Sequence, residues 1–159
     1  MTKIEEMLLE FDIPKVAKVQ QKFDRTQVVN LEEYLSKLLR SKNLPVNPGD
    51  RIAITGSSRG IADYPRIMRT AVHYIKEKGG TPFIVPAMGS HGGGVAEKQT
   101  ELLAELGITA ETVGAPIISS MEVVEIAKTA LGLPVYIDRN AAKADGILLL
   151  NRVKTHTSI

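Results

Sequence analysis

The feature that most constrains the fold is an alternation of short, continuously apolar runs with helical patterns. The runs are RIAIT (51–55), TPFIVP (81–86) and GILLLNRV (146–153), and each is too short to span a membrane. Strands without a polar face are typical of a parallel sheet that is buried between two layers. The sequence therefore predicts an α/β fold, with an open, mostly parallel sheet, helices on both faces and buried strands at these three places.

Two amphipathic helices are predicted between these strands. The first follows Asp63, which can cap it, and tolerates Pro65 in its first turn. Its apolar stripe consists of Ile67, Met68, Ala71, Val72 and Ile75. The second helix ends at Gly107, and its inward face carries Gln99, Leu102, Leu103 and Leu106.

The remaining elements are shorter. We expect an amphipathic helix over 4–11 and a weakly alternating strand over 15–23. A helix should follow Asn30, which forms a partial capping box with Glu33. Residues 123–138 predict an antiparallel, hairpin-like addition to the sheet that turns at Gly132, and a short helix should follow it.

Length, charge and cysteine content exclude several classes of protein. The 159 residues suffice for one globular domain, and a net charge of +2 without a long basic run gives no reason to expect a nucleic-acid partner. The absence of cysteine excludes disulfides, thiolate metal sites and cysteine nucleophiles. The first eleven residues are too acidic for a signal peptide, so we expect a cytoplasmic protein with no membrane partner.

Polar segments follow each of the three apolar strands. They are TGSSRGI (55–61), AMGSHGGG (87–94) and NRVKTHTSI (151–159). Because ligands of open α/β sheets bind beyond the carboxyl ends of the strands, these segments are expected to converge on one site.

Arg59 and His91 are the strongest candidates within these segments. The guanidinium of Arg59 suits a carboxylate or a phosphate. Glycines around His91 let a ligand approach the backbone, and the helix that follows favours a bound anion. The reference pKa of histidine lies near neutrality, so a proton shuttle at this position is plausible chemistry. A ligand-free surface loop is the alternative.

The last segment offers a second histidine. If the final strand continues, Arg152, Lys154 and His156 lie on one face, where the cations attract an acidic substrate and keep the imidazole neutral. A frayed, solvated end is the alternative. A zinc site formed by His91 and His156 lacks a third ligand. His73 lies opposite the apolar stripe of its helix, so we expect it to be exposed and without function.

Two other functions fit parts of the sequence. TGSSRGI is similar to the glycine turn of short-chain dehydrogenases, and Tyr74 with Lys78 matches their Tyr-x-x-x-Lys pair. That pair, however, falls on the helix that should cover the sheet, and the strand at 81–86 lacks the acidic residue that binds a ribose. A module that binds a small anion without catalysis is the second alternative.

The combination of GSSRGI, PFIVPAMGSHGGG, SSMEVVEI and GLPVYIDRNAAKADGILLLNRVKTHT resembles the N-terminal part of the nickel-dependent lactate racemase family. The likeness runs from about residue 45 to the end. It implies an isomerase, a racemase or epimerase that inverts a small 2-hydroxy acid by hydride transfer to a nickel-pincer pyridinium mononucleotide. It also implies that His91 and His156 alternate as acid and base, and that Arg59 lies in the active site. We predict that Arg59 and Lys154 bind the substrate through their positive charges. Gly89, Gly92 and Gly93 are then candidate cofactor contacts.

Two departures from the family pattern qualify this resemblance. Lactate racemases carry an acidic residue where this chain has Gly56, so a different 2-hydroxy acid is a possible substrate. Family members are longer, two-domain proteins, and their cofactor-bearing lysine and a nickel-ligating histidine lie beyond the position of Ile159. We therefore expect residues 1–159 to be an incomplete N-terminal domain that alone binds no cofactor or nickel and is inactive.

Overall fold

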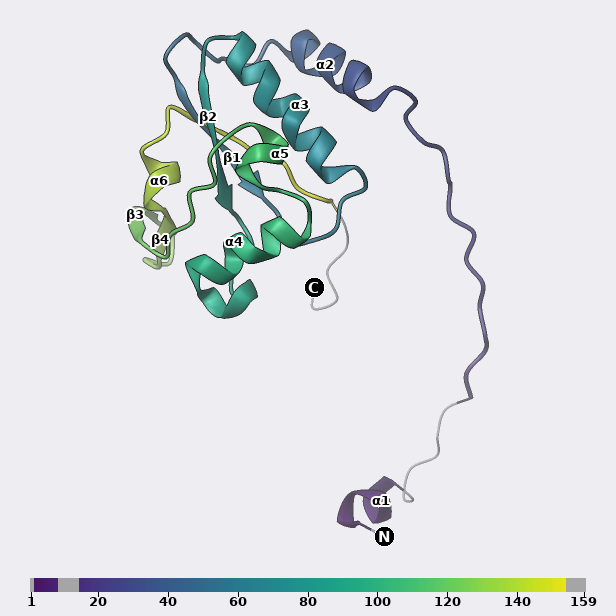
Figure 1. Cartoon of the computed structure of the whole chain (residues 1–159). Coiled ribbons are helices and arrows are strands. Elements are labelled where there is room, and N and C mark those ends of the chain that lie inside the picture. Colours follow the sequence, from purple (N-terminus) through teal and green to yellow (C-terminus); the bar gives the residue numbers. More distant parts are fainter. Residues whose placement is uncertain (1, 9–14, 154–159) are drawn as a thin grey trace.

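The structure is a computed structural model that describes residues 2–8 and 15–153 (Figure 1). The helices are α1 (Lys3–Leu8), α2 (Leu31–Lys42), α3 (Tyr64–Glu77), α4 (Ala96–Glu105), α5 (Ala110–Val113) and α6 (Arg139–Ala142), with a 3₁₀ turn, η1 (His91–Gly94). The strands are β1 (Arg51–Gly56), β2 (Thr81–Pro86), β3 (Val123–Lys128), β4 (Pro134–Asp138) and β5 (Gly146–Leu148). No helix in the described part of the chain is long and apolar enough to cross a membrane.

The strands form the predicted α/β arrangement. β2, β1 and β5 make a parallel sheet in that order, while β3 and β4 pair as a separate antiparallel hairpin. On the outer side of β2, Ile84 forms a parallel bridge with Ile117. The alternation of apolar runs and helices therefore predicted the fold class correctly.

The central strands are buried because both faces of the sheet are covered. Ile54 and Ile84 pack in one cluster with Met68 and Ile75 of α3. Leu103 of α4 and Val113 of α5 belong to the same cluster.

On the opposite face, Phe83 packs with Ala141 of α6 and Ile137 of β4. Side chains alternate between the two faces of a strand, so the continuous apolar runs fill both clusters.

Two strand predictions are wrong. β5 has only three residues, and it is not buried, because it lies at the edge of the sheet with β1 as its neighbour. Residues 149–153 do not continue it as a strand. Residues 15–23 form neither helix nor strand, since no strand in the described part of the chain lies beside them. The predicted helix over 4–11 is present as α1, with Phe11 outside the described residues.

The capping predictions for Asn30 and Asp63 are also wrong, although α2 and α3 begin where expected. Both residues adopt left-handed backbone angles, with φ of 54° and 55°, and neither side chain forms a cap hydrogen bond. Asparagine and aspartate tolerate this conformation better than most residues. The Asp63 carboxylate instead accepts a hydrogen bond from Arg66 at 3.0 Å.

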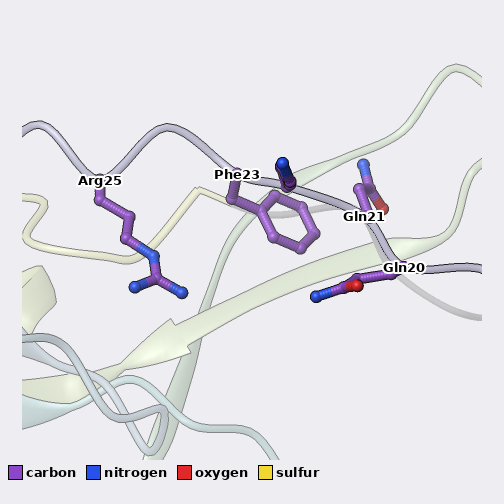
Figure 2. A pocket seen from close by; sticks show the side chains of 5 residues that line it. Gln20, Gln21, Phe23 and Arg25 are labelled. Atoms are coloured by element: carbon purple, nitrogen blue, oxygen red, sulfur yellow. The ribbon is translucent and has the colours of Figure 1, made fainter.

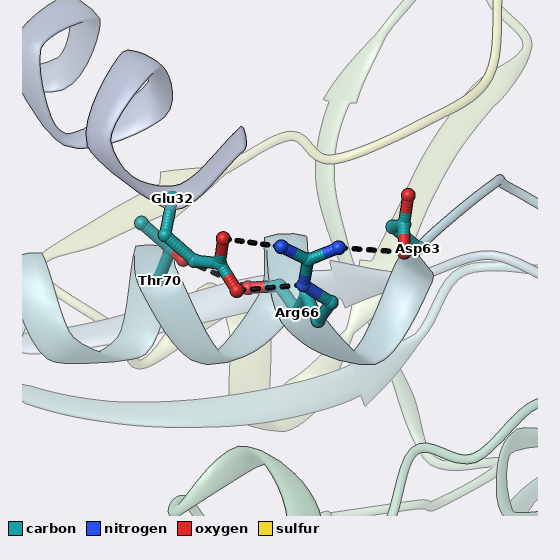
Figure 3. A network of polar contacts seen from close by, with 4 residues as sticks. All are labelled: Glu32, Asp63, Arg66 and Thr70. Atoms are coloured by element: carbon teal, nitrogen blue, oxygen red, sulfur yellow. Dashed lines mark hydrogen bonds and ion pairs between the residues drawn. The ribbon is translucent and has the colours of Figure 1, made fainter. Parts of the chain in front are cut away.

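Arg66 clamps α2 against α3 (Figure 3). Its Nε and Nη2 atoms donate to the two carboxylate oxygens of Glu32 at 2.6 and 2.5 Å, and its backbone carbonyl accepts from Thr70 at 2.8 Å. The hydrogen bonds from Arg66 are the largest cause that lowers the pKa of Glu32, from 4.5 to about 2. The clamp fixes the start of α2, where the N-terminal segment joins the domain.

Acidification is expected to release this clamp only below pH 4.5. A carboxylate with a depressed pKa contributes its stabilisation fully above the unfolded value of 4.5, and that contribution is lost as the pH falls towards about 2. The pair is exposed, so we expect only a small change in melting temperature. Carboxyl NMR titration should show the low pKa of Glu32, and its return towards 4.5 in Arg66→Ala. Lys37→Ala, a change on the same helix, should leave it low. A wild-type value near 4.5 would contradict the clamp.

Candidate functional site at the carboxyl edge of the sheet

The polar segments after β1 and β2 and the described part of the third, residues 151–153 after β5, lie at one edge of the sheet because these strands are parallel. The segment after β2 is tied to β1 by the Ala87 N–H, which donates to the Gly56 carbonyl at 2.8 Å. The segment after β5 is tied to β1 by the Leu150 N–H, which donates to Thr55 Oγ1 at 2.8 Å. These two contacts place side chains from distant parts of the sequence on one surface.

Tyr64 shapes the loop that carries Arg59. The Ser57 N–H donates to the buried Tyr64 hydroxyl at 2.7 Å, and the Arg59 N–H donates to Ser57 Oγ at 3.2 Å. Burial raises the pKa of Tyr64, so the hydroxyl stays neutral. The Arg59 side chain is exposed, and its guanidinium has no partner among residues 2–8 and 15–153. Within the described part of the chain, nothing therefore prevents this guanidinium from binding an anion.

Gln99 holds the loop that carries His91. This buried side chain of α4 donates from Nε2 to the carbonyls of Gly89 at 2.8 Å and of His91 at 3.1 Å. His91 itself is exposed, and its backbone N–H donates to Met88 at 3.3 Å. Gln99 therefore fixes the backbone of the loop from the side of α4. The His91 imidazole is exposed and has no partner in the described part of the chain.

The glycines of this loop face different surroundings. Gly89, Gly92 and Gly93 all have left-handed backbone angles, with φ of 59°, 65° and 68°. A Cβ atom at Gly89 or Gly93 would meet no atom within 4 Å, whereas one at Gly92 would lie 3.1 Å from the Cβ of Lys98. Open space therefore borders Gly89 and Gly93, while Gly92 packs against α4.

Of the other residues considered for the site, Arg152 and His73 are described by the structure, whereas two lie outside the described residues. Arg152 lies at the same edge, where its Nη1 donates to the Gly60 carbonyl at 3.2 Å, although it is not on a strand. Lys154 and His156 lie outside the described residues, so a pair of opposed histidines stays a prediction. His73 is exposed as expected, with its Nδ1 atom 3.3 Å from Glu77.

Tyr74 and Lys78 do not join the loops. Tyr74 is buried in α3, and the Lys78 ammonium lies 5.9 Å from the centre of its ring. The pair therefore belongs to the helix that covers the sheet, as its position in the sequence suggests. Within the described ranges, no group of three histidine, aspartate or glutamate side chains is arranged to hold a metal ion.

Tyr64 and Gln99 have positioning contacts that the sequence analysis did not identify. Gln99 had a usable signal, because a polar side chain on an otherwise apolar helix face must find buried partners. Tyr64 had a weaker signal: it stands at the start of α3, within reach of the loop after β1. Their partners are backbone atoms of loops, which no residue pattern reveals.

Replacement of Gln99 by leucine should loosen the His91 loop. The change removes two hydrogen bonds to loop carbonyls, which should cost about 1–3 kcal/mol of unfolding free energy and raise the amide exchange rates of residues 89–94. Denaturant unfolding and hydrogen exchange measure the two effects. Glu101→Leu, at an exposed position of the same helix, is the control and should alter neither. Unchanged exchange in the Gln99 variant would show that the side chain does not hold the loop.

The edge surface combines two groups with complementary chemistry. Arg59 offers a fork of donors that matches a carboxylate, and His91 on the neighbouring loop offers a nitrogen that can accept or release a proton.

In comparisons with known proteins, the chain matches no protein-family model, no curated protein and no solved structure.

Proposed function

We propose that this chain is the substrate-binding α/β domain of a racemase or epimerase that inverts a small 2-hydroxy acid. The observation that carries the proposal is the placement of Arg59 and His91 on adjacent loops at the carboxyl edge of the sheet, where neither side chain has a partner among the described residues. The resemblance of the loop sequences to nickel-dependent lactate racemases supports the same reaction class.

Arg59 binds the substrate carboxylate in this proposal. A guanidinium donates two parallel hydrogen bonds to a carboxylate, which fixes the orientation of the acid as well as its position. The contacts from Tyr64 to Ser57 and from Ser57 to Arg59 hold the loop backbone, so the guanidinium starts from a defined place. Arg152, which is tied to the same loop at Gly60, adds positive charge beside it.

His91 moves a proton at the substrate hydroxyl. Oxidation of a 2-hydroxy acid to a 2-keto acid removes a hydride from C2 and a proton from the hydroxyl oxygen, and inversion returns both. A histidine can accept and return that proton at neutral pH. His156 would serve the opposite enantiomer, as the family resemblance implies.

The described residues fit the nickel-pincer nucleotide in part. Open space at Gly89 and Gly93 leaves room for a planar group or a phosphate beside the loop, whereas Gly92 is packed against α4 and does not fit this role. When bound, the cofactor supplies the hydride acceptor. The described residues offer no cluster of metal ligands, so nickel would be held by the cofactor and by residues outside them.

Inversion is tested directly with the protein from its complete reading frame, supplied with the nickel cofactor. Single enantiomers of lactate and other 2-hydroxy acids are incubated with it, and the products are separated by chiral chromatography. The proposal predicts interconversion of the two enantiomers of at least one acid. Binding of these acids without interconversion would overturn it in favour of an anion-binding module.

Exchange of Arg59 for alanine should weaken substrate binding. Hydrogen bonds to a charged group contribute about 1.5–3 kcal/mol, which corresponds to an increase in KM of roughly 10–150-fold. The turnover number should change less than KM, because His91 remains in place. Arg69→Ala, an exposed arginine of α3, is the matched control and should leave KM unchanged. An unaltered KM in the Arg59 variant would remove this residue from the site.

A further inference from the structure

An N-terminal segment of the chain lies against none of the domain's strands. Residues 15–30, which we call the arm, form no helix or strand, and all are exposed. Three apolar side chains are almost fully open to solvent, with exposed fractions of 92% for Val16, 83% for Val19 and 71% for Phe23. Figure 1 shows the arm running away from the domain. Exposed apolar side chains repeated along one short segment make it a candidate for contact with another surface.

The arm also forms a surface hollow that is lined on one side only, by residues of the arm itself. Figure 2 shows this hollow, which has a volume of about 340 Å³. Its lining residues all come from the arm: Gln20, Gln21, Lys22, Phe23 and Arg25. Because one extended segment supplies every side chain, the hollow becomes an enclosed contact only when another surface lies against the arm.

The free edge of β5 offers such a surface. β5 pairs with β1 on one side, and no described strand pairs with its other side, so its backbone groups there can accept a further strand. Two apolar hollows, of about 110 and 130 Å³, follow each other along this edge. We call them the β5 groove, and they are lined by Leu35, Leu39, Leu44, Pro45, Val46, Ile52, Ile67, Ala71 and residues 146–150.

The arm and the β5 groove are complementary in backbone, polarity and charge. The arm is extended and rich in valine, and in a strand Val19 and Phe23 would lie on the same face. Residues 15–25 contain four basic residues and one acidic residue, for a net charge of +3. The carboxylates of Asp50 and Asp145 stand at the amino ends of β1 and β5, beside the groove.

We propose that the arm of one copy of this chain adds as a strand to the β5 groove of a second copy, and that the exchange is reciprocal. An extended segment that adds to a sheet edge gains backbone hydrogen bonds, and its alternate side chains fill the pockets beside the edge. Reciprocal exchange closes the pair with two-fold symmetry and buries both arms. A second copy is the occupant because the arm leads away from the body of its own domain (Figure 1).

The test is the molar mass of the full chain in solution, measured by light scattering across a range of protein concentrations. The proposal predicts a dimer for the wild type, and a monomer for Val19→Asp/Phe23→Asp in the arm and for Leu149→Asp in the groove. These positions are exposed, so thermal unfolding should show that the domain stays folded. Leu131→Asp, at a position that is 87% exposed in the hairpin turn, is the matched control and should remain dimeric.

Mixing the two monomeric variants distinguishes exchange from general association. The arm variant retains an intact groove, and the Leu149 variant retains an intact arm, so one of each should form a mixed dimer with a single exchanged arm. A monomeric wild type would overturn the proposal, whether its arm is free or folded onto its own domain. Dimers that survive the arm substitutions, or a mixture that stays monomeric, would overturn it as well.

Discussion

Replacement of His91 by asparagine should lower racemisation by about 10²–10⁴-fold in both directions, the usual cost of losing a positioned general base. In the proposed reaction every inversion uses both proton-transfer groups, so the loss of one slows the reaction from either enantiomer. Asparagine keeps a polar side chain of similar reach but cannot exchange a proton near neutral pH. Initial rates from each pure enantiomer, measured by chiral chromatography with the same cofactor-supplied protein as in the inversion test, give the effect.

His73→Asn is the matched control for this experiment. His73 is exposed on α3 and pairs with Glu77, so its replacement should leave racemisation unchanged. The His91 imidazole is also exposed and unpartnered in the described part of the chain, so both variants should unfold at the wild-type temperature. Near-wild-type rates in the His91 variant would remove this histidine from the reaction.

Truncation of Leu103 to alanine should lower the free energy of unfolding by about 2–5 kcal/mol, as expected for a large-to-small change in a packed core. Leu103 is completely buried in α4 and fills the space beneath the end of β1. A Cβ atom placed on Gly56 would lie 3.0 Å from its Cδ2 atom, so the side chain fits closely against that strand. Denaturant unfolding followed by circular dichroism measures the loss.

Leu131→Ala is the control for truncation of a leucine. Leu131 is exposed in the turn between β3 and β4, so its loss should change the unfolding free energy by less than about 0.5 kcal/mol. Similar small losses for both variants would show that Leu103 does not support the core. A large loss for Leu103 alone would confirm that this side chain supports the core beneath the end of β1.

The central elements could be predicted because their signals are local. The stripe on α3 repeats at helical spacing and packs on the sheet, so sequence and structure agree there. The apolar runs at β1 and β2 are buried on both faces, which is the arrangement that continuous apolar strands require. Their parallel pairing then placed the segments with Arg59 and His91 at the same edge of the sheet.

The errors arose where the length or burial of a strand, or the contacts of a side chain, depend on a neighbour that is distant in the sequence. β5 has the same apolar character as β1, but its edge position shortens it and exposes Ile147. Residues 15–23 have strand-like alternation without a neighbouring strand in the described structure. The supports from Tyr64 and Gln99 end on loop backbone atoms, so only the folded arrangement of the chain reveals them.

The central claim is that the carboxyl-edge loops bind a 2-hydroxy carboxylate, and an NMR titration of the full chain with L-lactate and D-lactate tests it most directly. The account predicts amide shift changes concentrated in residues 57–60, 89–94 and 149–152. It predicts their loss in Arg59→Ala and their retention in Arg69→Ala. Shift changes that fall elsewhere on the chain, or that persist without Arg59, would contradict the account.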